Sequence, residues 1–225
     1  RDCEMAPKQA KAYKQAKEDF IIELESGTLP TGSAMVKMIR LLQFASSYAE
    51  VETIEEIDDD GFPKIKYKTT LTEPSAKLDA FMDDIDTFGT EQVAVMSVSR
   101  QLLELLSTRL TKKGIKHGMI TGTTSEDDRN EAMENFQAGK IQFILFTSGA
   151  GGTGITLTAA RYLCRLQVPF SLVDYKQSLR RVRRIGSERH ENIIVIDYIT
   201  EDTEDDHVFE VLDKKSMSFE DVVRD

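Results

Sequence analysis

Residues 141–154 read IQFILFTSGAGGTG, an apolar run of strand length that continues directly into a glycine-rich loop. A strand that is apolar on both faces is typical of a parallel sheet covered by helices on each side. Glycines after such a strand let the backbone approach a phosphate group closely. The stretch therefore indicates an α/β fold with an anion-binding loop at one edge of the sheet.

The strand–helix alternation continues on both sides of this stretch. Strands are predicted at 93–96, 115–120, 162–168 and 193–196, and helices at 76–82, 101–110, 125–136, directly after the glycine loop, and at 203–215. Ser125 and Asp128 have the spacing of a capping box at the start of one of these helices. Alternation of this kind predicts a parallel α/β sheet with helices on both faces.

The first seventy residues differ in pattern. Two helices are predicted at 7–24 and 33–48, and acidic and lysine-rich alternating runs flank Asp60-Gly61, which is a hairpin signal over 51–70. We therefore expect three parts: a helical protrusion with a hairpin insertion at 1–74, the sheet domain at 75–200, and a C-terminal helical extension at 201–225.

Composition narrows the class of protein. The 225 residues are 40% hydrophobic and 30% charged with a net charge of −10, as in an ordinary globular protein, and no apolar run reaches membrane-spanning length. Two cysteines, Cys3 and Cys164, predict free thiols in a reducing, intracellular compartment. The three histidines, His117, His190 and His207, lack metal-ligand spacing, so we predict no metal site.

The segment 177–186, QSLRRVRRIG, places four arginines within five positions of this acidic chain. A helix there would put Gln177, Arg181 and Arg184 on one face. Guanidinium groups suit bidentate binding of phosphate, so a polyphosphate or a nucleic-acid backbone is one candidate ligand. The competing interpretation is a solvated basic helix that pairs with the protein's carboxylates.

Two nucleotide-binding patterns compete for the glycine loop. Gly149, Gly151 and Gly154 match a dinucleotide fingerprint, with Asp174 twenty residues further on, but this loop comes late in the strand series. A Walker A loop is excluded because Gly139-Lys140 is followed by isoleucine and lacks the earlier glycine. A glycine loop with an arginine helix and no P-loop predicts half of a phosphate site, whose arginines act on a nucleotide held elsewhere.

Two long motifs in order carry a resemblance to a known family. Residues 148–160, SGAGGTGITLTAA, resemble the fifth helicase motif, and Gln177, Arg181, Arg184, Ile185 and Gly186 fit the sixth at the expected distance. The chain resembles the C-terminal RecA-like lobe of the Swi/Snf-type helicase-like ATPases from about Ser75 to Lys215. Residues 75–78, 93–97 and 122–136 are similar to its other motifs.

The sequence also departs from this family at the motifs. Gly149 stands where the family has lysine or arginine, Thr156 where it has asparagine, and Ser187 where it has glutamine. Residues 170–172, FSL, replace Trp-Asn-Pro. With these departures the chain resembles a divergent member of the family, of viral or bacterial type, and one phosphate contact to DNA is in doubt.

The resemblance implies the second motor lobe of an ATP-dependent double-stranded DNA translocase. It implies that Arg181 and Arg184 are arginine fingers, that Gln177 holds them or the phosphate, and that Gly152 and Gly154 shape the loop at the nucleotide interface. ATP and Mg²⁺ would be held with an upstream RecA-like lobe that carries the P-loop and the Asp-Glu motif. This chain alone is expected to be inactive and to hold no cofactor.

Contacts to the DNA backbone are expected through amides and hydroxyls of Ser97, Gly122, Thr123 and Ser148. Arg180 and Arg183 are expected to be solvated. The alternatives are a non-catalytic nucleic-acid-binding module that uses the basic face 161–189, and a dinucleotide-binding domain. The compartment would be the cytoplasm of a bacterial or virus-infected cell, or the nucleus of a eukaryote.

Overall fold

The computed structural model describes residues 1–25, 31–57, 63–151, 155–188 and 190–224. The chain forms two compact units: unit 2 comprises Met5–Ala76, and unit 1 comprises Arg1–Glu4 together with Lys77–Asp225. Unit 2 is therefore inserted within the sequence of unit 1. The elements of unit 1 are β1 (Asp2–Cys3), α3 (Ala76–Asp83), η1 (Ile85–Phe88), β4 (Val93–Ser97), α4 (Arg100–Lys112), β5 (His117–Ile120), α5 (Glu126–Gln137), β6 (Phe143–Thr147), η2 (Ser148–Gly151), β7 (Tyr162–Arg165), α6 (Leu172–Val182), β8 (Ile194–Asp197), β9 (Ile199–Thr200) and α7 (Glu204–Arg224).

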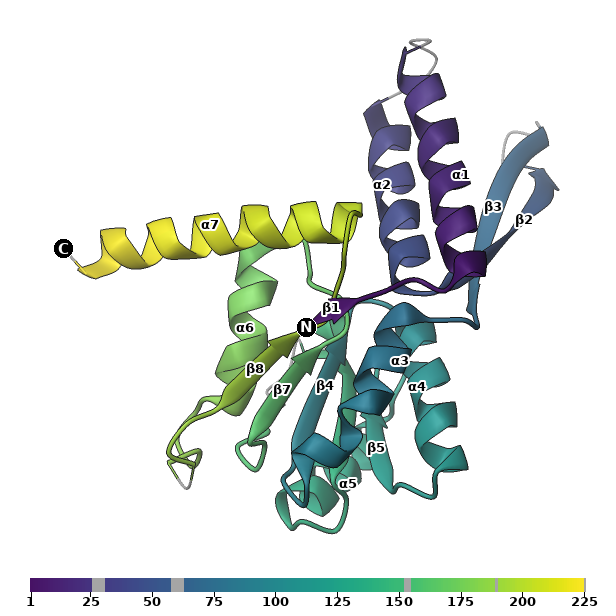
Figure 1. The fold of residues 1–225 in the computed structure, drawn as a ribbon. Helices are drawn as coiled ribbons and strands as arrows, with labels where there is room; N and C mark the ends of the chain where they lie inside the picture. The colour runs from purple at the N-terminus through teal and green to yellow at the C-terminus, as the bar shows by residue number, and fades with distance from the viewer. Residues whose placement is uncertain (26–30, 58–62, 152–154, 189, 225) are drawn as a thin grey trace. The chain divides into compact units, whose positions relative to one another are not determined.

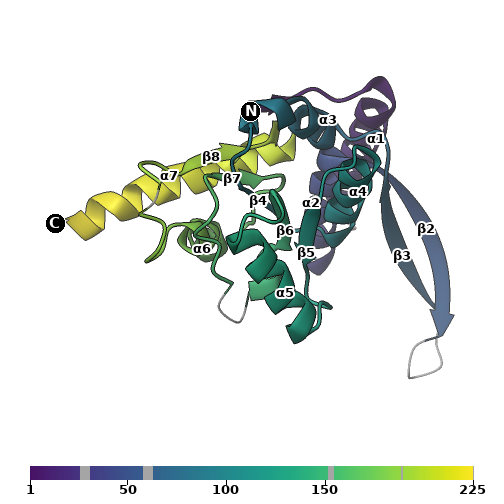
Figure 2. The same cartoon turned by 90° about the horizontal axis from the view of Figure 1, so that it is seen from below.

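Unit 1 is built on a five-stranded parallel sheet in the order β5-β6-β4-β7-β8 (Figure 1). The predicted fold class, a parallel sheet flanked by helices, is confirmed. Helices α3 and α4 cover one face of the sheet, and α5 and α6 cover the other, as the two views show (Figures 1 and 2).

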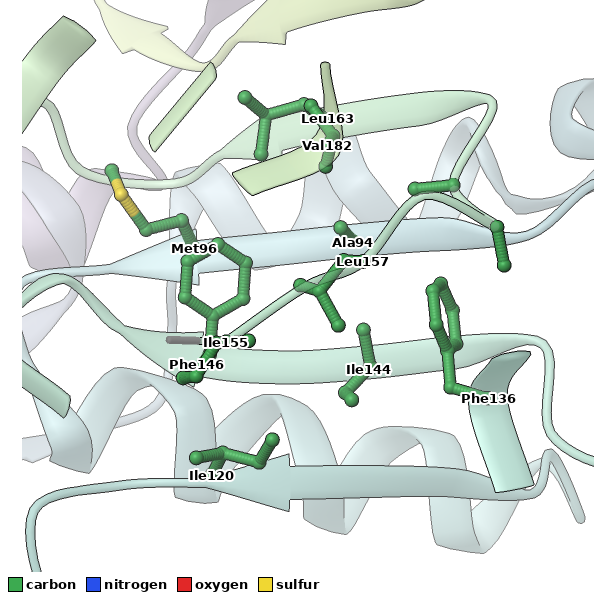
Figure 3. Close-up of a cluster of buried hydrophobic side chains, with 12 residues drawn as sticks. Ala94, Met96, Ile120, Phe136, Ile144, Phe146, Ile155, Leu157, Leu163 and Val182 are labelled. Carbon is green, nitrogen blue, oxygen red and sulfur yellow. The ribbon is translucent and has the colours of Figure 1, made fainter. Parts of the chain in front are cut away.

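Each strand divides its side chains between these two faces, as the period of two along a strand requires. Ala94 and Met96 of β4 join a buried cluster with Ile144 and Phe146 of β6 on the α5–α6 face (Figure 3). Phe143 points to the other face and makes edge contacts with Phe81 and Phe88. Burial on both faces is the physical reason for the continuous apolar strands in the sequence.

Three helices of unit 1, α4, α5 and α6, begin at serine side-chain caps. Ser125 accepts a hydrogen bond from the Asp128 amide and donates to the Asp128 carboxylate, as the capping-box spacing predicts. Ser99 caps α4, and Ser171 caps α6 by accepting from the Asp174 amide. The last of these caps fixes where the arginine-rich helix begins.

Unit 2 consists of α1 (Pro7–Glu25), α2 (Thr31–Ser46) and the antiparallel pair β2 (Tyr48–Ile57) and β3 (Pro63–Thr72). Gln9 is fully buried and joins these parts: its Nε2 donates to the carbonyls of Phe44 and Ala45, and its Oε1 accepts from the Ala76 amide. The hairpin was predicted from an Asp-Gly turn, and that turn lies outside the described residues.

Three features differ from the sequence predictions. Residues 155–161 form no helix, because their backbone groups bond to Gln137 of α5 and to the carbonyl of Arg181. The arginine helix ends at Val182, so Arg184 lies beyond it. The short strand β1 pairs with β9 and was not predicted. Within the described ranges, no helix is long and apolar enough to cross a membrane.

Candidate functional site

The residues predicted to contact DNA lie at the carboxyl-terminal ends of the sheet strands. All five strands are parallel, so their C-terminal ends meet at one edge. Ser97 and Thr147 end β4 and β6 in register, and the glycine loop and η2 follow β6. Ligands of open parallel sheets bind outside this edge. It is therefore the place to look for a phosphate site.

Arg181 occupies the last turn of α6 and is 9% exposed. Its Nη2 donates to the carbonyl oxygen of Ser148 over 3.1 Å, and its Cζ lies 5.3 Å from the ring centroid of Phe146. Its Nη1 is buried and has no hydrogen-bond partner among the residues that the structure describes. Burial lowers the pKa of the Arg181 guanidinium, and the charge of Asp174 opposes that shift. A buried cation thus faces the glycine loop with one donor unused.

Arg184 lies beyond the end of α6, is exposed, and donates from Nη1 to Oγ1 of Thr156 over 3.0 Å. The Leu157 amide donates to the carbonyl of Arg181 over 2.9 Å. Both bonds join the segment after the glycines to the end of the arginine helix. The two long sequence motifs are therefore one structural unit, although the predicted common helical face holds only for Gln177 and Arg181.

Gln137 of α5 holds the same segment from the other side. Its Nε2 donates to the carbonyl of Thr156 and to Oγ1 of Thr158, both at 3.1 Å, and its Oε1 accepts from the Ala159 amide at 2.8 Å. An amide side chain that bonds to three groups of one loop restrains the conformation of that loop, because each hydrogen bond favours the same arrangement. Sequence patterns carry no signal for this role.

Other polar residues of the arginine helix and its end are exposed, unlike Arg181. Gln177 is exposed on α6, and Arg180 and Arg183 are exposed as well. Gly152 and Gly154 lie outside the described residues. Gly149 is exposed, and a Cβ added there would meet no atom within 4 Å. Space for a side chain is therefore available at the position where the resembled family carries a cation.

Ser97, predicted as a DNA contact, is fully buried. Its hydroxyl donates to Oε1 of Gln167 over 2.7 Å, and the same oxygen accepts from the Ser99 amide over 2.8 Å. The hydroxyl of Ser97, at the end of β4, therefore bonds within the fold to a residue just after β7. Its contact with DNA stays a prediction, and such a contact would have to reach a buried hydroxyl.

Gly122 and Thr123 follow β5 and are exposed at the same edge. Thr123 Oγ1 accepts a hydrogen bond from Nη1 of Arg100 over 3.0 Å, and Arg100 also pairs with Glu104 at 2.7 Å. Because β6 lies between β4 and β5, this bond joins the chain after β4 to the chain after β5 across one intervening strand. The sequence prediction missed Arg100, although an arginine at the start of a helix just after a strand is a recognisable signal.

Comparison with known proteins bears directly on this site. Residues 76–186 match the family described as the helicase conserved C-terminal domain, and that range contains both motifs joined above. The chain carries the C-terminal RecA-like lobe of a Swi/Snf-type helicase-like ATPase. Within this range, hydrogen bonds join the arginine helix and the residues just after it to Ser148, Thr156 and Leu157.

Relatives of this Swi/Snf-type lobe are much longer proteins. An uncharacterized ATP-dependent helicase of Schizosaccharomyces pombe is 30% identical over 155 residues, which are 68% of this chain and 15% of that protein. The DNA repair and recombination protein RAD54 of Saccharomyces cerevisiae is 27% identical over 175 residues, 76% of this chain and 19% of that protein. The chain thus spans under a fifth of either relative.

A solved structure has the same fold. The SWI2/SNF2 ATPase core of Sulfolobus solfataricus in complex with double-stranded DNA aligns with a TM-score of 0.71 at 20% identity, over 99% of this chain and 44% of that chain. At this identity the likeness concerns the fold. Among the described residues of our lobe, no group of three or more His, Cys, Asp or Glu side chains could hold a metal ion.

Proposed function

We propose that this chain is the second motor lobe of an ATP-dependent double-stranded DNA translocase, and that it supplies arginine fingers to an ATP site completed by another lobe. The single observation that supports this proposal most is the state of Arg181. Its guanidinium is buried beside the glycine loop, and its Nη1 has no partner among the described residues.

A buried guanidinium with an unused donor fits a phosphate better than it fits water or a side chain. Desolvation of the charge is costly and is recovered when an anion with several acceptor oxygens arrives. Mg²⁺-bound ATP would supply the phosphoryl group and the negative charge. Arg181 would donate to that charge, Arg184 would do so after leaving Thr156, and Gln177 would orient one of them. Gly152 and Gly154 would shape the loop beside them.

The exposed part of the same edge fits a nucleic-acid backbone. Gly122, Thr123 and Ser148 offer amides and hydroxyls, and we add Arg100 as the cation of this group, since its guanidinium already bonds to Thr123. Phosphate contacts of this kind give affinity without reading sequence. A motor that tracks along DNA needs such sequence-independent contacts. An intracellular location follows from this proposed substrate.

The two alternatives predict different behaviour. A dinucleotide site would need a helix after the glycine loop, but residues 155–161 are not helical and Asp174 lies in the first turn of α6. A free-standing nucleic-acid-binding module would bind duplex DNA tightly as this chain alone, with a steep dependence of affinity on salt. Duplex titration of the chain at several salt concentrations separates that alternative from the half-site.

The decisive experiment measures ATP hydrolysis by a protein in which this lobe is joined to its proposed P-loop lobe. Arg181→Ala should lower DNA-stimulated kcat by about 10³-fold or more, as for other arginine fingers, while ATP binding changes little. Arg184→Ala tests the second finger, and Arg180→Ala is the matched control because Arg180 is exposed on the same helix. Unchanged turnover in Arg181→Ala, or DNA-stimulated hydrolysis by this chain alone, would refute the half-site.

A further inference from the structure

A second arginine of unit 1 is buried where the sequence predicts only an apolar strand. Arg165 ends β7, and Asp197 ends the neighbouring strand β8 in direct register with it. Arg165 is 4% exposed. Its Nε lies 2.5 Å from Oδ1 of Asp197 and its Nη2 lies 2.8 Å from Oδ2, so the two groups form a bidentate ion pair.

The same guanidinium contacts the arginine helix. Its Cζ lies 3.8 Å from the ring centroid of Tyr175 in α6, and its Nη1 lies 3.4 Å from the Tyr175 carbonyl and 3.4 Å from Oγ of Ser178. Ser178 in turn donates to the Tyr175 carbonyl over 2.7 Å. The ion pair is therefore a fixed platform at the sheet edge against which one face of α6 rests.

That face of α6 is the one that carries the proposed finger. Tyr175, Ser178 and Arg181 follow each other at three-residue steps, so they lie along one stripe of the helix. Ser178, Arg181 and Val182 are the buried residues of α6. A rotation or a shift of α6 at Tyr175 would thus be carried one to two turns along the helix to the guanidinium of Arg181.

We infer that Arg165 and Asp197 are positioning residues that set the rotation and axial position of α6, and thereby the place of Arg181 at the glycine loop. This inference rests on the proposed function, because it assigns to the pair a role in turnover. Asp197 fixes the orientation of the Arg165 guanidinium through the bidentate ion pair. The guanidinium in turn lies over the ring of Tyr175 and restrains its position. A lysine could pair with Asp197 but could not stack as a flat group on the ring.

The test compares variants in the two-lobe protein at a temperature well below their melting temperatures. Arg165→Met should lower kcat by about ten- to hundredfold, as expected for a small misplacement of a catalytic group, with the KM for ATP changed less than threefold. The kcat of Arg165→Lys should lie between the kcat of Arg165→Met and that of the parent protein. Arg165→Met combined with Arg181→Ala should be no slower than Arg181→Ala alone, because the first change acts through the second residue.

A matched control separates positioning from mere stability. Lys77 and Asp205 form another buried ion pair of unit 1, 2.5 Å from Nζ to Oδ2, which joins α3 to α7. Lys77→Met should lower the melting temperature as Arg165→Met does, yet leave kcat within about twofold. Should that variant not fold, Arg109→Met, which breaks the half-buried pair with Asp79, replaces it.

Hydrogen exchange on this chain alone gives a readout that needs no second lobe. Amides of 175–182 should exchange faster in Arg165→Met than in the control, while those of α4 are unchanged. If Arg181→Ala abolishes turnover but Arg165→Met behaves like the control in kcat and exchange, the positioning role is wrong and the proposed function stands. If Arg181→Ala leaves turnover intact, the proposed function fails. In that case the hydrogen exchange of the α6 amides in Arg165→Met decides whether the ion pair positions the helix.

Discussion

Arg184 donates from Nη1 to Oγ1 of Thr156 over 3.0 Å and so joins the chain after the arginine helix to the chain after the glycine loop. The contact exists because a hydroxyl stands at position 156. The resembled family has an asparagine there. In this chain the two motifs are joined through Thr156 as the acceptor, with the bond from the Leu157 amide to the Arg181 carbonyl beside it.

Thr156→Val tests this coupling because it keeps the branched shape and removes the acceptor. The bond is exposed on the Arg184 side, so we expect the free energy of unfolding of this chain to fall by no more than about 1 kcal/mol. Thr156→Ser keeps the hydroxyl and should stay within about 0.5 kcal/mol of the parent. Urea denaturation measures both. Equal stability of the valine and serine variants would show that the bond contributes nothing.

Alanine should destabilise the chain at Gly186 but have little effect at Gly149. Gly186 has φ +103°, a backbone conformation that residues other than glycine adopt only with strain. Gly186→Ala should therefore cost about 1–3 kcal/mol of unfolding free energy. Gly149→Ala should be within about 0.5 kcal/mol of the parent, because a Cβ there meets open space. A neutral Gly186→Ala variant would contradict the backbone conformation described at the end of the sixth motif.

Arg100→Ala should weaken binding of duplex DNA by the two-lobe protein similarly for unrelated sequences. A single lost phosphate contact should reduce the slope of log affinity against log salt by about 1. Lys112, at the other end of α4, gives the matched control: Lys112→Ala removes the same charge from the opposite end of that helix and should leave the slope unchanged. Titrations at four or more salt concentrations measure the slope. Equal slopes for both variants would remove Arg100 from the DNA contact set.

Alkaline pH should destabilise unit 1 because two cysteine thiols and one tyrosine hydroxyl are buried in their protonated forms. Burial raises the pKa of Cys3 from 9.0 to about 11, and burial also raises the pKa values of Cys164 and Tyr198. The folded chain therefore keeps protons that the unfolded chain releases, so the free energy of unfolding falls as pH rises from about 9 toward about 11, and these groups cause no change below about pH 9.

Urea denaturation at a series of pH values checks that sign. Cys3→Ala should flatten the decline between pH 9 and 11, although it lowers stability at neutral pH by removing a buried side chain. In the matched variant Cys164→Ala, the fall in unfolding free energy at still higher pH should also become less steep. Stability that stays constant between pH 8 and 11 in the parent chain would rule out the buried, protonated thiols.

The sheet and both motifs could be predicted because each rests on a local pattern. Apolar strands, the Ser125 cap and the two motif spacings are all visible within short windows of sequence. The helix expected after the glycine loop was wrong because the amide of Leu157 and the carbonyl of Thr156 bond to Arg181 and Gln137, which lie far away in the chain. Tertiary partners decide such loops, and local propensity does not record them.

The buried polar residues of the site were harder to foresee. Ser97 follows an apolar strand and suggests a ligand contact, but Gln167, far along the chain, takes its hydroxyl. Arg165 was a partial exception. A charged residue at the end of an apolar strand, with Asp197 ending the next strand, is a pattern that could have predicted the ion pair if strand register were known. The register of parallel strands is set by helices and loops that the sequence describes only loosely.

The insertion of unit 2 between β1 and α3 has a consequence for the order of folding. During synthesis the helices α1 and α2 and the hairpin β2–β3 can form from neighbouring segments, since their contacts are local in sequence. Strand β1 has to wait for β9, because Asp2 pairs with Ile199 and Cys3 with Thr200, almost a whole chain length away. Long loop closure is slow, so the first residues of this chain should be among the last to reach their native partners.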